Sequence, residues 1–109
     1  MNVRLYFWQR MTAAIMAPLV LVHLGLILYG GSKGLTAAEI LGRTRGSLAW
    51  ALFYGVFVAA AAVHASIGLR NVLAEWTRIE ARWVGPIATT AGALLGLLGL
   101  RAVYAVVLS

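Results

Sequence analysis

The sequence contains no cysteine and only three acidic residues. The absence of cysteine excludes disulfides, thiolate metal sites, iron–sulfur ligation and cysteine nucleophiles within this chain. Charged residues make up 11% of the 109 residues, against about a quarter in an ordinary soluble domain, and 62% are hydrophobic. This composition disfavours both a disordered chain and an ordinary soluble enzyme, and the length suits one domain, residues 1–109.

The few charges are mostly basic, for a net charge of +6, which points to a nucleic acid or to a membrane surface. Their placement decides between the two. Three stretches carry no charged residue: 22 residues at 11–32, 24 at 46–69 and 18 at 83–100. As helices rising ~1.5 Å per residue they would span roughly 33, 36 and 27 Å, against a hydrocarbon core of about 30 Å.

These runs are too continuous for the alternating strands of a membrane barrel. The sequence therefore predicts an all-α membrane protein with three transmembrane helices near 11–31, 47–73 and 85–107. They run up-down-up and form part of a larger bundle.

The connectors agree with three helices. Glycines at 30–34 end the first, residues 36–45 predict an interfacial turn or short helix, and Gly85–Pro86 opens the third. The first run is longer than the core of a signal peptide, so we expect a retained helix. Five arginines fall on the N-terminal side of the membrane and four basic residues on the opposite side. This small excess favours a cytoplasmic N-terminus.

Two histidines, His23 and His64, fall within the predicted spans. An ionisable group at membrane depth is a functional-site candidate, and neutral imidazole is a common ligand of metals, including haem iron. If Arg10 and Trp76 mark one membrane surface, the histidines lie 13 and 12 residues from it. At ~1.5 Å per residue, both would be roughly 18–20 Å deep. We therefore expect them to share a depth.

On the second helix, a spacing of ~100° per residue puts six residues on one stripe. They are Phe53, Phe57, His64, Gly68, Asn71 and Glu75. Gly68, one turn beyond His64, would leave room for a flat macrocycle, as a histidine-ligated haem requires. The alternative is that the small residues serve helix packing, with His64 and His23 hydrogen-bonded across the bundle.

A second cluster lies where the first helix begins and the second ends. Its residues are Trp8, Gln9, Arg10, Asn71, Glu75 and Trp76. They suit an amphipathic ring ligand such as a quinone, although interfacial anchoring is the commoner role of Trp and Arg. No catalytic triad, carboxylate pair, phosphate loop or nucleic-acid pattern is found, so we expect a non-catalytic subunit that binds no nucleic acid.

Two motifs carry a family resemblance. Residues 8–13, WQRMTA, resemble the (H/Q/V)-R-x-T-(A/G) start of helix one in the cytochrome b membrane anchors of succinate dehydrogenase and fumarate reductase. Residues 64–76, HASIGLRNVLAEW, are similar to the helix-two motif of these anchors, H-x-x-x-G-hydrophobic followed by an acidic residue and tyrosine. The resemblance covers the first two helices; the third matches only in hydrophobicity.

The resemblance implies a subunit that anchors a flavoprotein and an iron–sulfur subunit to the inner (cytoplasmic) membrane. It implies a b-type haem, often held between histidines of two small membrane subunits, and a quinone site in a respiratory electron-transport chain. His64 matches the axial ligand. Arg10 matches the arginine near the quinone and the haem propionates, and Glu75 with Trp76 matches the acidic–tyrosine pair. A second anchor subunit or another copy of this chain would complete the bundle.

The sequence also departs from the family pattern. Trp76 replaces the tyrosine, and its indole N–H can only donate. The serine-containing pattern of the larger anchor is missing, which favours the smaller anchor type. His23 has no counterpart, so it is a second ligand of the same haem, the ligand of another haem, or a structural residue. An alternative function is a small transporter or channel subunit whose histidines relay protons or bind substrate.

Overall fold

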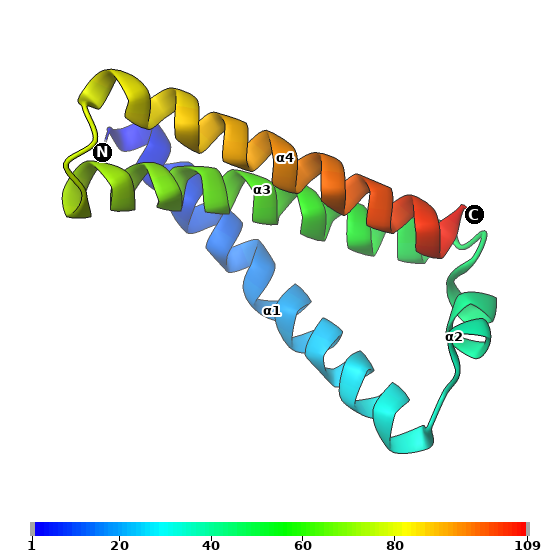
Figure 1. The fold of residues 1–109 in the computed structure, drawn as a ribbon. Helices are drawn as coiled ribbons and strands as arrows, with labels where there is room; N and C mark the ends of the chain where they lie inside the picture. Colours follow the sequence, from blue (N-terminus) through cyan, green and yellow to red (C-terminus); the bar gives the residue numbers. More distant parts are fainter. Residues whose placement is uncertain (1, 109) are drawn as a thin grey trace.

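The computed structural model describes residues 2–108, and over this range the chain is helical with short connectors. The elements are α1 (Val3–Lys33), α2 (Ala37–Thr44), α3 (Leu48–Trp76) and α4 (Ala81–Val107). The helices α1, α3 and α4 are long and apolar enough to cross a membrane and run up-down-up, which confirms the three predicted spans (Figure 1).

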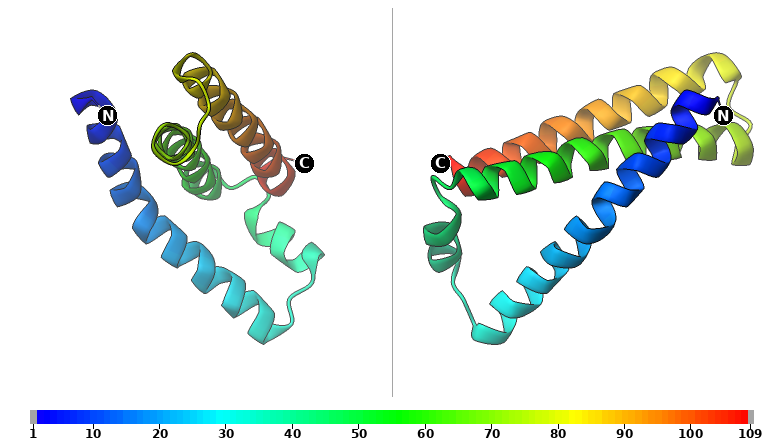
Figure 2. Two further views of the ribbon diagram at one scale, coloured as in Figure 1. Left: turned by 60° about the vertical axis from the view of Figure 1, so that its left-hand side comes forward. Right: turned by 180° about the vertical axis from the view of Figure 1, so that it is seen from behind.

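The helices α3 and α4 form a closely packed antiparallel pair (Figures 1 and 2). Glycines on α4 allow the close approach. A Cβ atom on Gly92 would lie 2.7 Å from Ser66 Cβ, and one on Gly99 would lie 2.6 Å from Val58 Cγ1. The Ser66 hydroxyl donates to the Ala88 carbonyl across the interface, at 3.1 Å. Small residues and an interhelical hydrogen bond are what holds helices together where lipid removes the hydrophobic driving force.

The end of this pair where α3 begins and α4 ends is closed by the last residue of α2 and the turn that follows it. The Thr44 hydroxyl donates to the Val106 carbonyl at 2.6 Å, and the Gly46 N–H donates to the Val107 carbonyl at 2.6 Å. Gly46 has φ +74°, which glycine adopts without strain. Two carbonyls in the last turn of α4, which lack intrahelical donors, are thereby satisfied. The contact holds α2 across this end of the α3–α4 pair (Figure 1).

The helix α1 packs on α3 along its first half and then diverges from it (Figures 1 and 2). It ends at Gly34, whose φ of +65° lets the Leu35 N–H return to the Gly30 carbonyl at 3.0 Å. The segment between α1 and α3, which contains α2, then connects the far end of α1 back to α3. The result is an open wedge between α1 and the α3–α4 pair, with α2 at its wide end.

Two predicted boundaries were wrong. The first helix begins at Val3, where Asn2 caps it by accepting the Leu5 N–H, so residues 3–10 belong to the helix despite their charges. The last helix begins at Ala81, before Gly85–Pro86, so Pro86 lies inside α4. Charge-free stretches mark the part of a helix that lies in hydrocarbon; they do not mark where its hydrogen bonding starts.

The close approach at Gly92 predicts a destabilising substitution. Gly92→Ala places a methyl group against Ser66 and 3.2 Å from the Ala62 carbonyl oxygen, which cannot move freely. We expect a loss of about 1 to 3 kcal/mol in stability, as for an overpacked core. Unfolding of the purified protein in detergent measures it.

Gly25→Ala is the matched control, because a Cβ there meets nothing within 4 Å. It should be as stable as the parent protein. Equal stability of the Gly92 and Gly25 variants would contradict the packing of α3 on α4.

Candidate functional site

His64 on α3 is tied to α1 through one ring nitrogen. Its Nδ1 lies 3.2 Å from Thr12 Oγ1 and 3.3 Å from the Gln9 carbonyl oxygen. That carbonyl can only accept, and the Thr12 hydroxyl donates to the Trp8 carbonyl at 2.6 Å. Both neighbours therefore accept from His64, which assigns the proton to Nδ1.

This tautomer leaves the lone pair on Nε2 free. Within residues 2–108, no hydrogen bond is formed by His64 Nε2. Metal-bound histidines are oriented in this way, with one nitrogen donating to a carbonyl or similar acceptor and the other facing the metal. Thr12 is only 4% exposed, so the acceptor is itself held firmly.

His64 lines a groove of about 550 Å³ between α1, α3 and α4. The α3 wall near it is made of small residues, Ala61, Ala62 and Ala65, and the α4 wall includes Leu95 and Gly99. No charged residue lines the groove. A largely apolar cavity of this size with a few polar groups is typical of a cofactor or ligand site.

His23 lines the same groove but lies far from His64 along the helices. Its ring makes edge contacts with Tyr54 and Phe57, at centroid distances of 5.8 and 5.5 Å. Phe57 precedes His64 by seven residues, which is about 10 Å along α3. The two rings therefore do not face each other across one small volume.

The shared depth expected for the two histidines was therefore wrong. His64 contacts Thr12, eleven residues before His23 on α1. The cause is the register of the two helices. Gln9 lies opposite Gly68, so Trp76 extends eight residues, about 12 Å, beyond the level of Gln9 and its neighbour Arg10.

Gly68 faces α1 rather than the groove. A Cβ on it would lie 3.5 Å from Gln9 Nε2, and Gly68 is not among the residues that line the cavity. The small residues beside the open groove are the alanines on the other side of His64. Gly68 therefore lets Gln9 lie close against α3, next to the histidine.

Sequence reasoning placed Gln9 in the quinone cluster and Thr12 in a family motif, but it paired neither residue with His64. Gln9 Oε1 is buried and lacks a hydrogen-bond partner among the described residues, which marks an unfilled polar requirement beside His64. The signal was available, since two polar residues spaced i, i+3 share a helix face with His23. What the sequence could not show is that this face meets α3.

The proposed quinone residues gather at one end of the bundle but are not brought into contact with one another. Arg10 lies over the Tyr6 ring at 5.6 Å and is exposed, about 100° around α1 from Gln9. It therefore does not share the position on α1 from which Gln9 meets α3. Glu75 is exposed, Trp76 is 80% exposed, and Asn71 is half-buried one turn before Glu75. Any ligand that meets Arg10 and Trp76 together must extend over both, or a further chain must contribute.

Within residues 2–108, no three His, Cys, Asp or Glu side chains come together as a metal-binding group. The candidate site therefore consists of His64, whose Nε2 forms no hydrogen bond within residues 2–108, and of the uncharged apolar groove that it lines. Gln9 and Thr12 contact the histidine from α1. Such a site suits a large apolar ligand with a metal centre of its own, and it does not suit a bare metal ion.

Comparison with known proteins identifies the family. Residues 2–104 match the family described as the succinate dehydrogenase/fumarate reductase transmembrane subunit. No curated protein and no solved structure matches the chain significantly. The match spans nearly the whole chain, including most of the third transmembrane helix, whose sequence resembled the family only in hydrophobicity. The chain belongs to the transmembrane subunit family of succinate dehydrogenase and fumarate reductase.

Proposed function

We propose that this membrane-anchor subunit binds a b-type haem through His64 Nε2 and helps to form a quinone site. The observation that carries the haem assignment is the Nδ1–H bond from His64 to the Gln9 carbonyl and Thr12 Oγ1, which leaves Nε2 without a hydrogen bond on a residue that lines an apolar groove. A bound haem would supply one-electron redox chemistry. The alanines Ala61, Ala62 and Ala65 leave space for a flat ring beside α3.

The second axial ligand is proposed to come from another chain. His23 approaches Phe57 and Tyr54 rather than His64, so one iron between the two histidines of this chain is not supported. A second anchor subunit or another copy of this chain would supply the opposing histidine and complete the bundle. His23 then remains the ligand of a separate haem or a structural residue in an aromatic cluster.

The quinone site is proposed at the end of the bundle where α1 begins and α3 ends. Asn71, Glu75 and Trp76 line this end of α3, and Arg10 presents its guanidinium on the outer side of α1. Arg10 can hold the carboxylates of a haem, or the quinone, only together with a chain packed on that outer side. A membrane partner and the iron–sulfur subunit are the expected contributors.

In the cell, the subunit is proposed to anchor a flavoprotein and an iron–sulfur subunit to the inner (cytoplasmic) membrane, with its N-terminus in the cytoplasm. Electrons from the iron–sulfur subunit would pass to quinone near α1 and α3. The family match favours this role over that of a small transporter or channel, for which the structure offers no specific observation.

Substitution of the proposed ligand tests the haem assignment. In the purified complex, His64→Ala should remove the contribution of the haem at His64 from the b-type band of the reduced-minus-oxidised spectrum, because no other described side chain places a free imidazole nitrogen at that position. His23→Ala is the matched control and should keep this haem. An unchanged spectrum in His64→Ala, or complete loss in His23→Ala, would contradict the assignment.

The orientation of His64 gives a second test. Thr12→Val keeps the shape of the side chain but removes the acceptor for Nδ1–H, and loss of such a supporting partner typically lowers metal affinity about 10- to 100-fold. We expect a lower haem-to-protein ratio and a shifted haem midpoint potential. Thr12→Ser should restore both.

Thr90→Val on the exposed side of α4 is the control for that substitution, because it makes the same chemical change away from the groove. If Thr12→Val retained parental haem content and midpoint potential, the hydrogen bond to Thr12 would have no role in positioning His64.

The quinone proposal is tested at Trp76. Trp76→Phe removes the indole N–H, and one lost hydrogen bond of about 0.5 to 1.5 kcal/mol predicts a roughly two- to tenfold higher KM for quinone. Activity of the complex with a soluble artificial acceptor should not change. Trp83→Phe, at the same end on α4, is the control; an equal effect of both substitutions would argue for anchoring at the membrane surface instead.

A further inference from the structure

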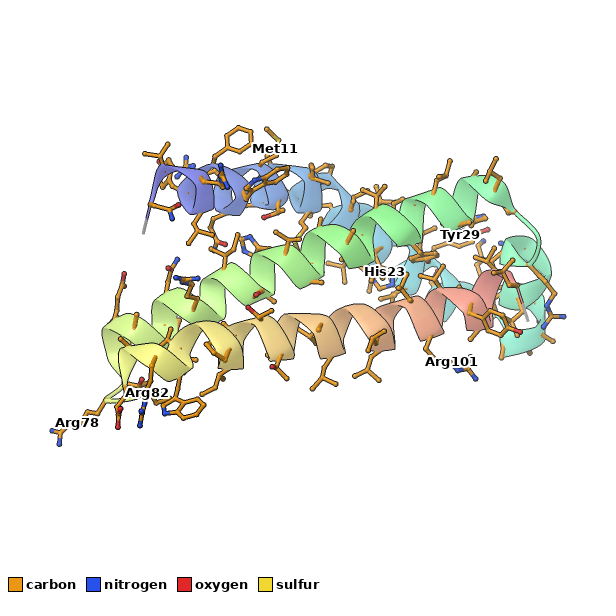
Figure 3. The ribbon with its side chains drawn as sticks, turned by 90° about the horizontal axis from the view of Figure 1, so that it is seen from above. Met11, His23, Tyr29, Arg78, Arg82 and Arg101 are labelled. Atoms are coloured by element: carbon orange, nitrogen blue, oxygen red, sulfur yellow. The ribbon has the colours of Figure 1, made fainter. Side chains whose placement is uncertain are left out.

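A second cavity lies at the wide end of the wedge, where α1, α2 and the start of α3 meet. It has a volume of about 300 Å³ and is separate from the end of the bundle assigned to quinone. Its walls include Leu26 and Ile27 from α1 and Ile40 from α2. In Figure 3, Tyr29 lies nearer to α2 than His23 does, and Arg78 and Arg82 lie at the opposite end.

The polar groups of this cavity are hydrogen-bond donors around one cation. Arg43, Tyr29, Trp50, Tyr54 and His23 line it, and the last two also line the groove at His64. In the described part of the chain, the hydroxyls of both tyrosines and the Trp50 indole N–H have no hydrogen-bond partner. The Thr44 hydroxyl, in contrast, already donates to the Val106 carbonyl.

Arg43 has no carboxylate to pair with. The acidic residue one turn before it, Glu39, is engaged in the cap of α2, where its carboxylate accepts from the Thr36 hydroxyl at 3.0 Å and from the Thr36 N–H at 3.3 Å. Within residues 2–108, the one ion pair joins Arg82 to Glu80 at the other end. The cavity therefore combines an uncompensated guanidinium, three further donors and apolar walls.

These features identify the ligand by its chemistry. Donors with an unpaired cation call for an acceptor-rich anion, and guanidinium suits phosphate oxygens. The apolar walls call for hydrocarbon chains, and Trp and Tyr are enriched at the level of lipid headgroups. We propose that this cavity binds an anionic phospholipid, with its phosphate at Arg43 and an acyl chain along α1.

This lipid differs from those of the surrounding bilayer, which contact every apolar face of the protein, because its phosphate would pair with Arg43. A neutral ring ligand such as a quinone would leave the Arg43 charge unpaired. A haem carboxylate is the other anion available to this family, and the test below distinguishes it.

The experiment measures lipid retained by the purified full-length protein, in its complex, after exchange into mild detergent. Mixed micelles containing phosphatidylglycerol or phosphatidylcholine are added, and bound lipid is counted by native mass spectrometry. The parent protein should retain phosphatidylglycerol in preference to phosphatidylcholine. Arg43→Gln should lower that retention about fivefold or more, as expected for the loss of one basic residue at an anionic lipid.

Arg101→Gln is the matched control. It removes the same charge at the same end of the bundle, but Arg101 lies over Tyr104 and does not line the cavity. It should retain phosphatidylglycerol at the parental level. Tyr29→Phe, which removes one hydroxyl and little volume, should show a smaller loss than Arg43→Gln.

Four results would overturn the proposal. Equal losses in Arg43→Gln and Arg101→Gln would indicate general surface charge, and equal retention of the two lipids would exclude recognition of the anion. Thermal stabilisation of the delipidated protein by inorganic phosphate alone, abolished in Arg43→Gln, would identify a phosphate site without a lipid. Loss of the haem band in Arg43→Gln would assign this arginine to a haem carboxylate.

The haem measurement also keeps this proposal independent of the proposed function. Lipid retention that depends on Arg43 would stand even if His64→Ala left the spectrum unchanged, because Arg43 does not line the groove at His64, although His23 and Tyr54 line both cavities.

Discussion

The hydrogen bond from His64 Nδ1 to Thr12 and the Gln9 carbonyl has two roles: it holds α1 against α3, and it fixes the tautomer of the histidine. This polar contact links the first half of α1 to α3. In the hydrocarbon core of a membrane, no water is available to an unsatisfied N–H group. The same bond decides which imidazole nitrogen is free. His64 also lines the apolar groove between α1, α3 and α4, so the free nitrogen belongs to a residue at that groove.

The rest of the fold can be understood as a support for that contact. The glycines of α4 bring it against α3, and the bonds from Thr44 and Gly46 to the end of α4 fix the far end of the pair. Two helices so closely joined provide a firm wall. α1, held only along its first half, can diverge and leave the cavities open between itself and that wall.

The correct predictions came from two features of the sequence, the length of its uncharged stretches and its local motifs. The three spans follow from stretches without charge, and the family follows from the residues around Arg10 and His64. The register between α1 and α3 could not be predicted, because composition places helix ends only within a few residues of the membrane surface. Two residues of error at each end change which groups meet, and so Gln9 and Thr12, rather than His23, turned out to lie beside His64.

That register also leaves polar groups of this chain in places that a partner could cover. Arg10 is exposed, the Gln9 amide oxygen is buried with no donor among residues 2–108, and the groove that His64 lines is open although it lies between membrane-spanning helices. Polar groups in such places are costly when only lipid surrounds them. A single subunit with several of these unmet requirements, all on or beside α1, is most stable when another chain or a cofactor covers that helix. The divergence of α1 therefore fits one subunit of a larger assembly, as membership of this transmembrane subunit family implies.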